Sequence, residues 1–201
     1  MLEALELECE RGSRTLFRGL SLQVRPGEAL RVAGANGSGK TCLLRILCGL
    51  LAPTAGCVRW KGNDIVRLRE DYSCALVYLG HAAAVKDDFT AAENLRVACS
   101  IAGEPVDEDA ARTALKSFAV PETAPLRRLS QGQRRRAALA RLALAGKRPL
   151  WLLDEPFTAL DAEGVAVLKS IIEKHKAQGG AAVFTTHQDA GIPATRVIDL
   201  G

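Results

Sequence analysis

The sequence predicts an α/β fold for a single domain of 201 residues, with a mixed-sheet core, an antiparallel β edge and an inserted helical subdomain. A glycine-rich loop at 34–39 stands between an apolar strand-like run and a helix-like run. Alternating apolar and polar residues at 5–10 and 20–25 predict half-buried antiparallel strands. The apolar run at 150–153 and the stretch 181–186, which is apolar as far as Phe184, predict further strands of the core.

The composition is that of an ordinary globular protein, with 48% hydrophobic and 25% charged residues. The formal net charge of +4 is too small to require a polyanionic partner. The six cysteines include no C-x-x-C pair, so we expect reduced thiols rather than a disulfide framework or a zinc site. The acidic start does not resemble a signal peptide, and no window approaches an uninterrupted apolar membrane span. We therefore expect a chain that does not itself cross a membrane.

The elements before the glycine-rich loop are a hairpin and a strand. A turn at 11–14 joins the two alternating strands, and Pro26-Gly27 leads into an apolar strand at 30–33. Leucines and an isoleucine recur at helical spacing over 41–51. The loop is therefore preceded by a strand and followed by a helix.

The stretch 34–41 matches G-x-x-x-x-G-K-[ST], the phosphate-binding P-loop. Its glycines allow several N–H groups to point at an anion, and the following helix adds the positive end of its dipole. Lys40 is expected to reach the β- and γ-phosphates of a nucleoside triphosphate, and Thr41 to hold Mg²⁺. The alternative, a glycine-rich turn that binds nothing, is disfavoured by the flanking strand and helix. The expected nucleotide-binding residues are Gly34, Ala35, Asn36, Gly37, Ser38, Gly39, Lys40, Thr41 and Cys42.

Strands and then helices follow the P-loop helix. A strand is expected at 57–60, and the apolar run 74–79 predicts a buried strand. Thr90 begins a helical pattern, with Glu93 at the reciprocal position of a capping box. The expected helices span 90–102 and 107–118 and start again at Ser130, within a helical subdomain of approximately 87–147.

Two carboxylates, Asp154 and Glu155, directly follow the buried strand at 150–153. They are thus expected at the edge where open α/β sheets bind ligands. Asp154 is suited to the Mg²⁺ shell and Glu155 to polarising the attacking water as general base. Paired acids after a strand are also often a helix cap, but the P-loop upstream favours the functional interpretation. The chain is then expected to form a helix at 159–178, a strand at 181–186 that leads to His187, and a short strand at 197–200.

The segment Leu129-Ser130-Gln131-Gly132-Gln133 precedes a helix, and by itself it is consistent with a capped helix start. However, the order of P-loop, L-S-x-G-Q, hydrophobic-Asp-Glu, Ala159-Leu160-Asp161 and strand-His187 resembles the ATP-binding subunit of ABC transporters. The resemblance covers essentially the whole chain. It implies a P-loop NTPase of the ABC ATPase cassette type that binds ATP and Mg²⁺ and hydrolyses ATP.

The same resemblance implies roles for single residues. Lys40, Glu155 and His187 are the implied catalytic residues, with His187 contacting the γ-phosphate. Thr41 and Asp154 are the implied Mg²⁺ ligands.

The resemblance also implies a head-to-tail homodimer. Ser130 and Gly132 would contact the γ-phosphate of the ATP held on the P-loop of a second copy. Asp161 would lie in the loop that communicates across the dimer.

Three positions depart from the family pattern. Gln131 stands where glycine is usual in the signature segment. Arg11 replaces the aromatic residue that stacks on adenine, although a guanidinium can also lie flat on a π face. His81 stands where a glutamine usually touches Mg²⁺ and couples to the membrane partner. We expect Arg11 in the nucleotide site and His81 in the metal site, with Thr41 and Asp154.

Tyr78-Leu79-Gly80-His81, followed by Phe89-Thr90 and Ala92-Glu93-Asn94-Leu95, resembles the ATP-binding subunit of the bacterial cytochrome c maturation system, long called the haem exporter. This resemblance implies two ATP-binding subunits with two membrane-spanning permease subunits and other haem-pathway proteins. It implies peripheral association with the cytoplasmic face of the inner membrane. There, ATP hydrolysis would energise haem delivery or the release of a haem-loaded chaperone.

A P-loop is also compatible with other functions. The chain could serve another ABC transporter, or be a soluble ABC ATPase without a transport role. A small-molecule kinase with a P-loop has no use for L-S-x-G-Q. A nucleic-acid patch is disfavoured, because no aromatic side chain is interleaved with the arginines at 127–141 and these do not all share one helical face.

Overall fold

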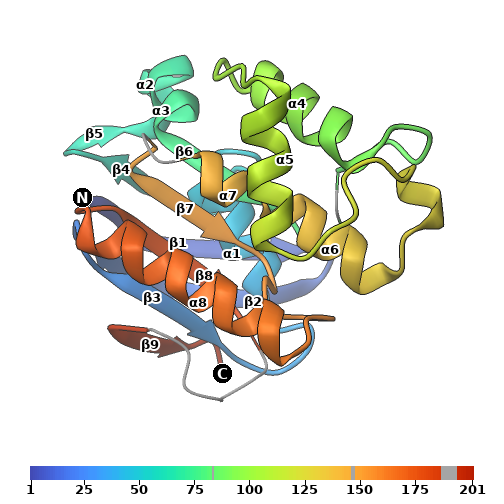
Figure 1. Cartoon of the computed structure of the whole chain (residues 1–201). Helices are drawn as coiled ribbons and strands as arrows, with labels where there is room; N and C mark the ends of the chain where they lie inside the picture. The colour runs from blue at the N-terminus through green and yellow to red at the C-terminus, as the bar shows by residue number, and fades with distance from the viewer. Residues whose placement is uncertain (83, 146–147, 187–193) are drawn as a thin grey trace. The chain divides into compact units, whose positions relative to one another are not determined.

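The computed structural model describes residues 1–82, 84–145, 148–186 and 194–201 (Figure 1). Across these ranges no helix combines the length and the apolar character that a membrane crossing requires. The chain divides into two compact units. The first unit comprises Met1–His81, Arg148–Pro156 and Lys174–Gly201, and the second comprises Ala82–Lys147 and Phe157–Glu173. The expected single domain with a helical subdomain at 87–147 stays a prediction.

The first unit contains an antiparallel sheet of order β2-β1-β4-β5 and a parallel sheet of order β6-β7-β8-β3-β9. This arrangement confirms the α/β fold class, with the antiparallel β edge as a sheet of its own. The antiparallel strands are β1 (Leu2–Arg11), β2 (Arg14–Val24), β4 (Ala55–Trp60) and β5 (Asn63–Asp64). The parallel strands are β3 (Ala29–Ala33), β6 (Leu76–Leu79), β7 (Leu150–Leu153), β8 (Ala181–Thr185) and β9 (Arg196–Asp199).

The P-loop helix α1 (Lys40–Leu47) connects the cores of these two sheets. It packs against β1 of the antiparallel sheet and against β7 and β8 of the parallel sheet. Its buried face, which includes Leu43, Leu44 and Leu47, joins one hydrophobic cluster with residues of both sheets. β3 lies between β8 and β9 and runs parallel to both. The loop that follows it therefore emerges at the carboxyl edge of the parallel sheet (Figure 1).

The prediction of a strand over 74–79 is wrong at its first two residues, which are helical. Two short helices, α2 (Ile65–Leu68) and α3 (Glu70–Ala75), precede β6, which begins only at Leu76. The buried Arg148 donates hydrogen bonds to the carbonyls of Ser73 (3.0 Å) and Leu76 (2.8 Å). This distant arginine satisfies the carbonyls where the helix changes to a strand, so the apolar run alone could not locate the boundary.

The second unit is helical. It contains α4 (Ala91–Ile101), α5 (Glu108–Ser117), η1 (Leu126–Arg128), α6 (Gln131–Leu139), α7 (Arg141–Leu144) and most of α8 (Ala162–Ala177). The capping box of Thr90 and Glu93 is confirmed, and Asp107 caps α5 by accepting from the Ala110 N–H at 2.7 Å. The helix predicted at 159–178 starts at Ala162, and the helix that follows Ser130 divides at Ala140.

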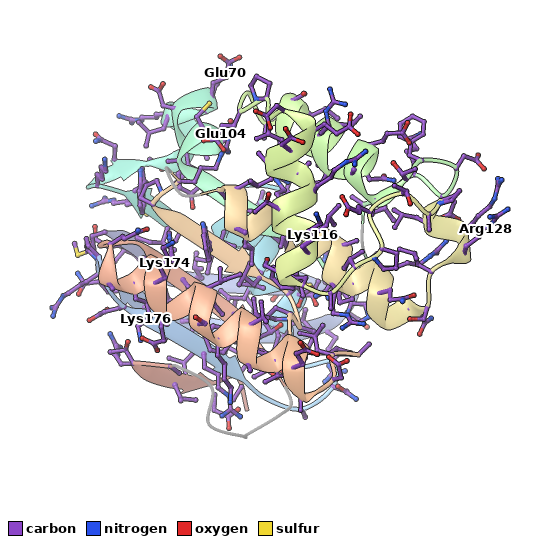
Figure 2. All side chains as sticks on the ribbon, in the orientation of Figure 1. Glu70, Glu104, Lys116, Arg128, Lys174 and Lys176 are labelled. Atoms are coloured by element: carbon purple, nitrogen blue, oxygen red, sulfur yellow. The ribbon has the colours of Figure 1, made fainter. Side chains whose placement is uncertain are left out.

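At the end of α8 in the first unit, the His175 ring stacks on Trp151 with 3.7 Å between ring centroids. His175 is buried between Lys174, which is exposed, and Lys176, which is half-buried; both lysines are labelled in Figure 2. Burial lowers the pKa of His175, because the charged imidazolium loses its hydration. Gly180 passes so close that a Cβ there would overlap the His175 ring.

We expect Gly180→Ala to destabilise the protein by about 2 kcal/mol, because its methyl group would displace a ring held between tryptophan and backbone. Urea unfolding measures this loss. In a His175→Ala background, Gly180→Ala should lower the free energy of unfolding much less. Equal losses in both backgrounds would show that contact with the ring is not the cause.

Candidate functional site

The P-loop conformation depends on close packing against β2. Gly39 is the N-cap of α1 and has a left-handed backbone, with φ of 101°. A Cβ at Gly39 would lie 3.1 Å from the Leu16 Cβ and 3.2 Å from the ring of Phe17. A larger residue at this position would therefore be both strained and crowded. The glycine pattern of the motif thus has a steric basis in this chain.

Lys40 lies folded across the loop that precedes it. Its ammonium donates to the carbonyl oxygens of Gly34 (2.8 Å) and Ala35 (2.9 Å), and the side chain is buried. Both acceptors are neutral, and none of the ion pairs in the described part of the chain includes Lys40. The loop therefore carries a buried positive charge suited to an anion.

Thr41 and Asp154 meet at the carboxyl edge of the parallel sheet. The Thr41 hydroxyl donates to Oδ2 of Asp154 at 2.9 Å, although 113 positions separate them in the sequence. The other carboxylate oxygen, Oδ1, accepts from the Thr185 hydroxyl at 2.8 Å. Asp154 is 1% exposed. A hydroxyl and a carboxylate brought together in this way are hard oxygen ligands of the kind that Mg²⁺ binds.

Glu155 is held next to this pair. Its N–H donates to Oγ1 of Thr185 at 2.7 Å, so a single threonine orients both consecutive acids. The backbone of Glu155 has a φ of 49°, which is unusual for a residue other than glycine. Such strained positions are often found at functional sites. Thr185 was not among the expected site residues, although it lies in the predicted strand 181–186, which leads toward this edge.

Arg45 and Tyr78, the first residue of the Tyr78–His81 segment, also lie near this edge, and neither was expected as a site residue. The guanidinium of Arg45, on α1, hydrogen-bonds the hydroxyl of Tyr78, on β6. Burial raises the pKa of Tyr78, and the nearby Asp154 adds to the rise. The pKa of Arg45 is raised first by its hydrogen bond to Tyr78. The raised pKa keeps the phenol in its neutral form.

In the second unit, the signature segment forms a capped helix start. The Ser130 hydroxyl accepts from the Gln133 N–H at 3.2 Å, and Oε1 of Gln133 accepts from the Ser130 N–H at 2.9 Å. A Cβ at Gly132 would lie 2.9 Å from the Ala159 carbonyl, so glycine allows close backbone approach. The predicted helix cap at Ser130 is therefore confirmed. The Ser130 side chain lies at a helix N-terminus, where the helix dipole favours anions.

Asp161 has a local structural role in the same unit. Its Oδ1 accepts from the Gly164 N–H at 2.9 Å, at the start of α8, and its Oδ2 pairs with Arg136 on α6 at 3.4 Å. The aspartate therefore ties the signature helix to the loop before α8.

Three expected residues remain, and the strand end before one of them lies beside the acid pair: the Asp154 N–H donates to the carbonyl of Leu79, the last residue of β6, at 2.8 Å. Arg11 is exposed at the end of β1, and His81 is exposed after β6. His187 lies outside the described residues. Within the part that the structure describes, no three His, Cys, Asp or Glu side chains form a cluster that could hold a metal by themselves. A cation on Thr41 and Asp154 would therefore depend on other ligands, such as phosphate oxygens and water.

Comparison with known proteins gives consistent results. The family described as ABC transporter matches residues 17–158. The cytochrome c biogenesis ATP-binding export protein CcmA of Aromatoleum aromaticum is 55% identical over 204 residues, covering 100% of this chain and 95% of the relative. CcmA of Pseudomonas aeruginosa is 46% identical, with 100% of both chains covered.

Solved structures agree on the fold. The ATP-binding cassette MJ0796, in a dimeric post-hydrolysis state bound to ADP and Pi, matches with a TM-score of 0.85 and 24% identity, covering 99% of this chain and 94% of the cassette. An ATP-binding subunit of an ABC transporter matches with a TM-score of 0.81 and 24% identity, covering 92% and 79%.

Proposed function

Because this chain belongs to the ABC transporter family and, within it, to the cytochrome c biogenesis ATP-binding export proteins CcmA, we propose that its ATPase activity energises haem delivery, or the release of a haem-loaded chaperone, for c-type cytochromes. The chain is an ATPase of the ABC class. The cargo, the membrane partners and the roles of single residues are the proposed part.

The Thr41–Asp154 contact of 2.9 Å carries the assignment of the catalytic centre. It brings the phosphate-binding loop next to the acid pair. ATP hydrolysis requires this, because the phosphates, the metal and the attacking water must meet in one place. Thr41 and Asp154 would hold Mg²⁺, which neutralises phosphate charge when bound. Lys40 would exchange its two carbonyl partners for the β- and γ-phosphates. Glu155 would orient and deprotonate the attacking water.

The other nucleotide contacts rest on the resemblance. The backbone N–H groups from Gly34 to Cys42 would bind the phosphates, and Arg11 would lie on the adenine. His187 would contact the γ-phosphate, and His81 would take the place of the metal-touching glutamine.

The working assembly is proposed to be two copies of this chain with two membrane-spanning permease subunits. Ser130 and Gly132 of one copy would contact the γ-phosphate on the other, and Asp161 would transmit this contact. The helix N-terminus at Ser130 supports this role, because its dipole favours an anion. The complex would place the chain at the cytoplasmic face of the inner membrane, as a peripheral subunit.

One experiment tests the haem pathway. The tagged chain is purified from detergent-solubilised cells with its bound membrane proteins, and haem is measured on the periplasmic chaperone in cells carrying wild type or Lys40→Ala. We expect cytochrome c maturation proteins in the complex and haem accumulation on the chaperone in the variant. Recovery of an unrelated permease, with unchanged chaperone haem, would contradict the haem assignment and leave the ATPase assignment intact.

A further inference from the structure

The tip of the β1–β2 hairpin lies against the P-loop. Leu16 and Phe17, near the start of β2, contact the loop at Gly39, as described above. Two residues earlier in the same strand, Arg14 reaches the middle of the loop. Its Nη1 is the nearest atom that a Cβ on Gly37 would meet, at 3.8 Å. A guanidinium thus lies beside the phosphate-binding loop, on a strand that the loop itself contacts.

Among the residues that the structure describes, no acidic side chain pairs with Arg14. Four residues further along β2, Arg18 provides the contrast. Its guanidinium bonds Glu8 at 3.2 Å and Glu10 at 3.4 Å. Glu8 and Glu10 of this hairpin therefore balance the positive charge of Arg18, and neither of them pairs with Arg14.

Arg14 also faces a like charge. The β1–β2 register pairs Arg11 directly with Arg14, and both side chains are exposed. Like charges directly opposite each other in an antiparallel pair are destabilising. An anion bound beside them would relieve this repulsion. Arg14, the member of this pair beside Gly37, is located where the proposed function would bring a polyphosphate.

We propose that Arg14 is a phosphate-binding residue of the nucleotide site, acting from the hairpin side of the P-loop while Lys40 acts from within it. This inference rests on the proposed function. The guanidinium would bond a phosphate oxygen of the bound nucleotide, an interaction for which its planar donors are suited. Because Gly37 belongs to the phosphate loop, the contact is with phosphate and does not depend on the base. The ligand class is thus a nucleoside di- or triphosphate.

Titration calorimetry with ATP, ADP and inorganic tripolyphosphate tests the proposal on the purified chain. We expect Arg14→Gln to raise the Kd for all three about tenfold, as the loss of one charge-assisted hydrogen bond predicts. Arg14→Lys should recover part of this loss, since it keeps the charge without the planar donors. The matched control is Arg18→Gln, which removes an exposed arginine of the same strand and should leave each Kd within about twofold of wild type.

Each other result has a definite meaning. If Lys40→Ala weakens binding while Arg14→Gln binds like wild type, Arg14 is not a phosphate ligand and the proposed function stands. If Arg14→Gln weakens ATP and ADP but not tripolyphosphate, the contact is with ribose or base, and the proposal is wrong. If the wild-type chain binds none of the three, the proposed function and this inference both fail. Thermal unfolding of each variant checks that the exposed substitution leaves the fold intact.

Discussion

Replacing Glu155 with glutamine is expected to lower ATP turnover at least about 100-fold, because general bases contribute factors of this size. The amide keeps the shape of the side chain but cannot accept the proton of the attacking water. ATP binding should persist, since the Thr41–Asp154 contact and the loop around Lys40 are untouched. The backbone hydrogen bond from Glu155 to Thr185 does not involve the changed group either.

Phosphate release and nucleotide binding should be measured on the same preparation. Glu163→Gln is a suitable control, because this exposed acid in the first turn of α8 has no proposed part in the reaction. Turnover of Glu155→Gln close to that of the control would remove Glu155 from the role of base. If Glu155→Gln loses both turnover and ATP binding, Glu155 instead helps to bind the nucleotide or its metal.

Replacing Ser130 with arginine is expected to abolish hydrolysis in the homodimer, because a bulky cation would stand where the partner's γ-phosphate is proposed to bind. The effect should appear on the site of the other copy. An equal mixture of Ser130→Arg and Glu155→Gln chains therefore should regain activity. Each mixed dimer would contain one site with an intact Glu155 and an intact Ser130, and random pairing should restore about a quarter of wild-type turnover.

A chain carrying both substitutions supplies the control for this mixture. Mixed with wild type, it forms heterodimers in which neither site is intact, so those heterodimers should be inactive. Ser100→Arg, on the exposed face of α4, tests whether an added arginine in the second unit is harmful by itself. If the two inactive single variants do not complement each other, Ser130 acts on the nucleotide of its own chain or only as the helix cap seen here.

Local sequence patterns predicted most of the elements that carry the site. The P-loop could be identified because its glycines meet a steric demand, which is visible in the contact of Gly39 with β2. The helix starts at Thr90, Asp107 and Ser130 were predictable because capping depends on residues three or four positions apart. Hydrophobic alternation likewise indicated the β1–β2 hairpin.

The features that the sequence did not predict correctly all depend on contacts between residues far apart in the chain. The boundary between α3 and β6 depends on Arg148, more than 70 positions away, which bonds the carbonyls at the junction. The role of Thr185 in orienting Asp154 and Glu155 arises because β8 pairs with β7. No local pattern marks a threonine at the end of an apolar strand as such a partner.

The sequence by itself determined the α/β class, the phosphate-binding loop, the acid pair and the family, because these depend on residue types at short, ordered spacings. Only the tertiary structure decided which of the arginines lies beside the phosphate loop. Arg11, Arg14 and Arg18 look alike along the hairpin, yet Arg18 is bound by two acids and Arg14 is adjacent to Gly37. The physical reason is that charge compensation depends on distances in space, which are set by strand register and by the packing of the hairpin on the loop.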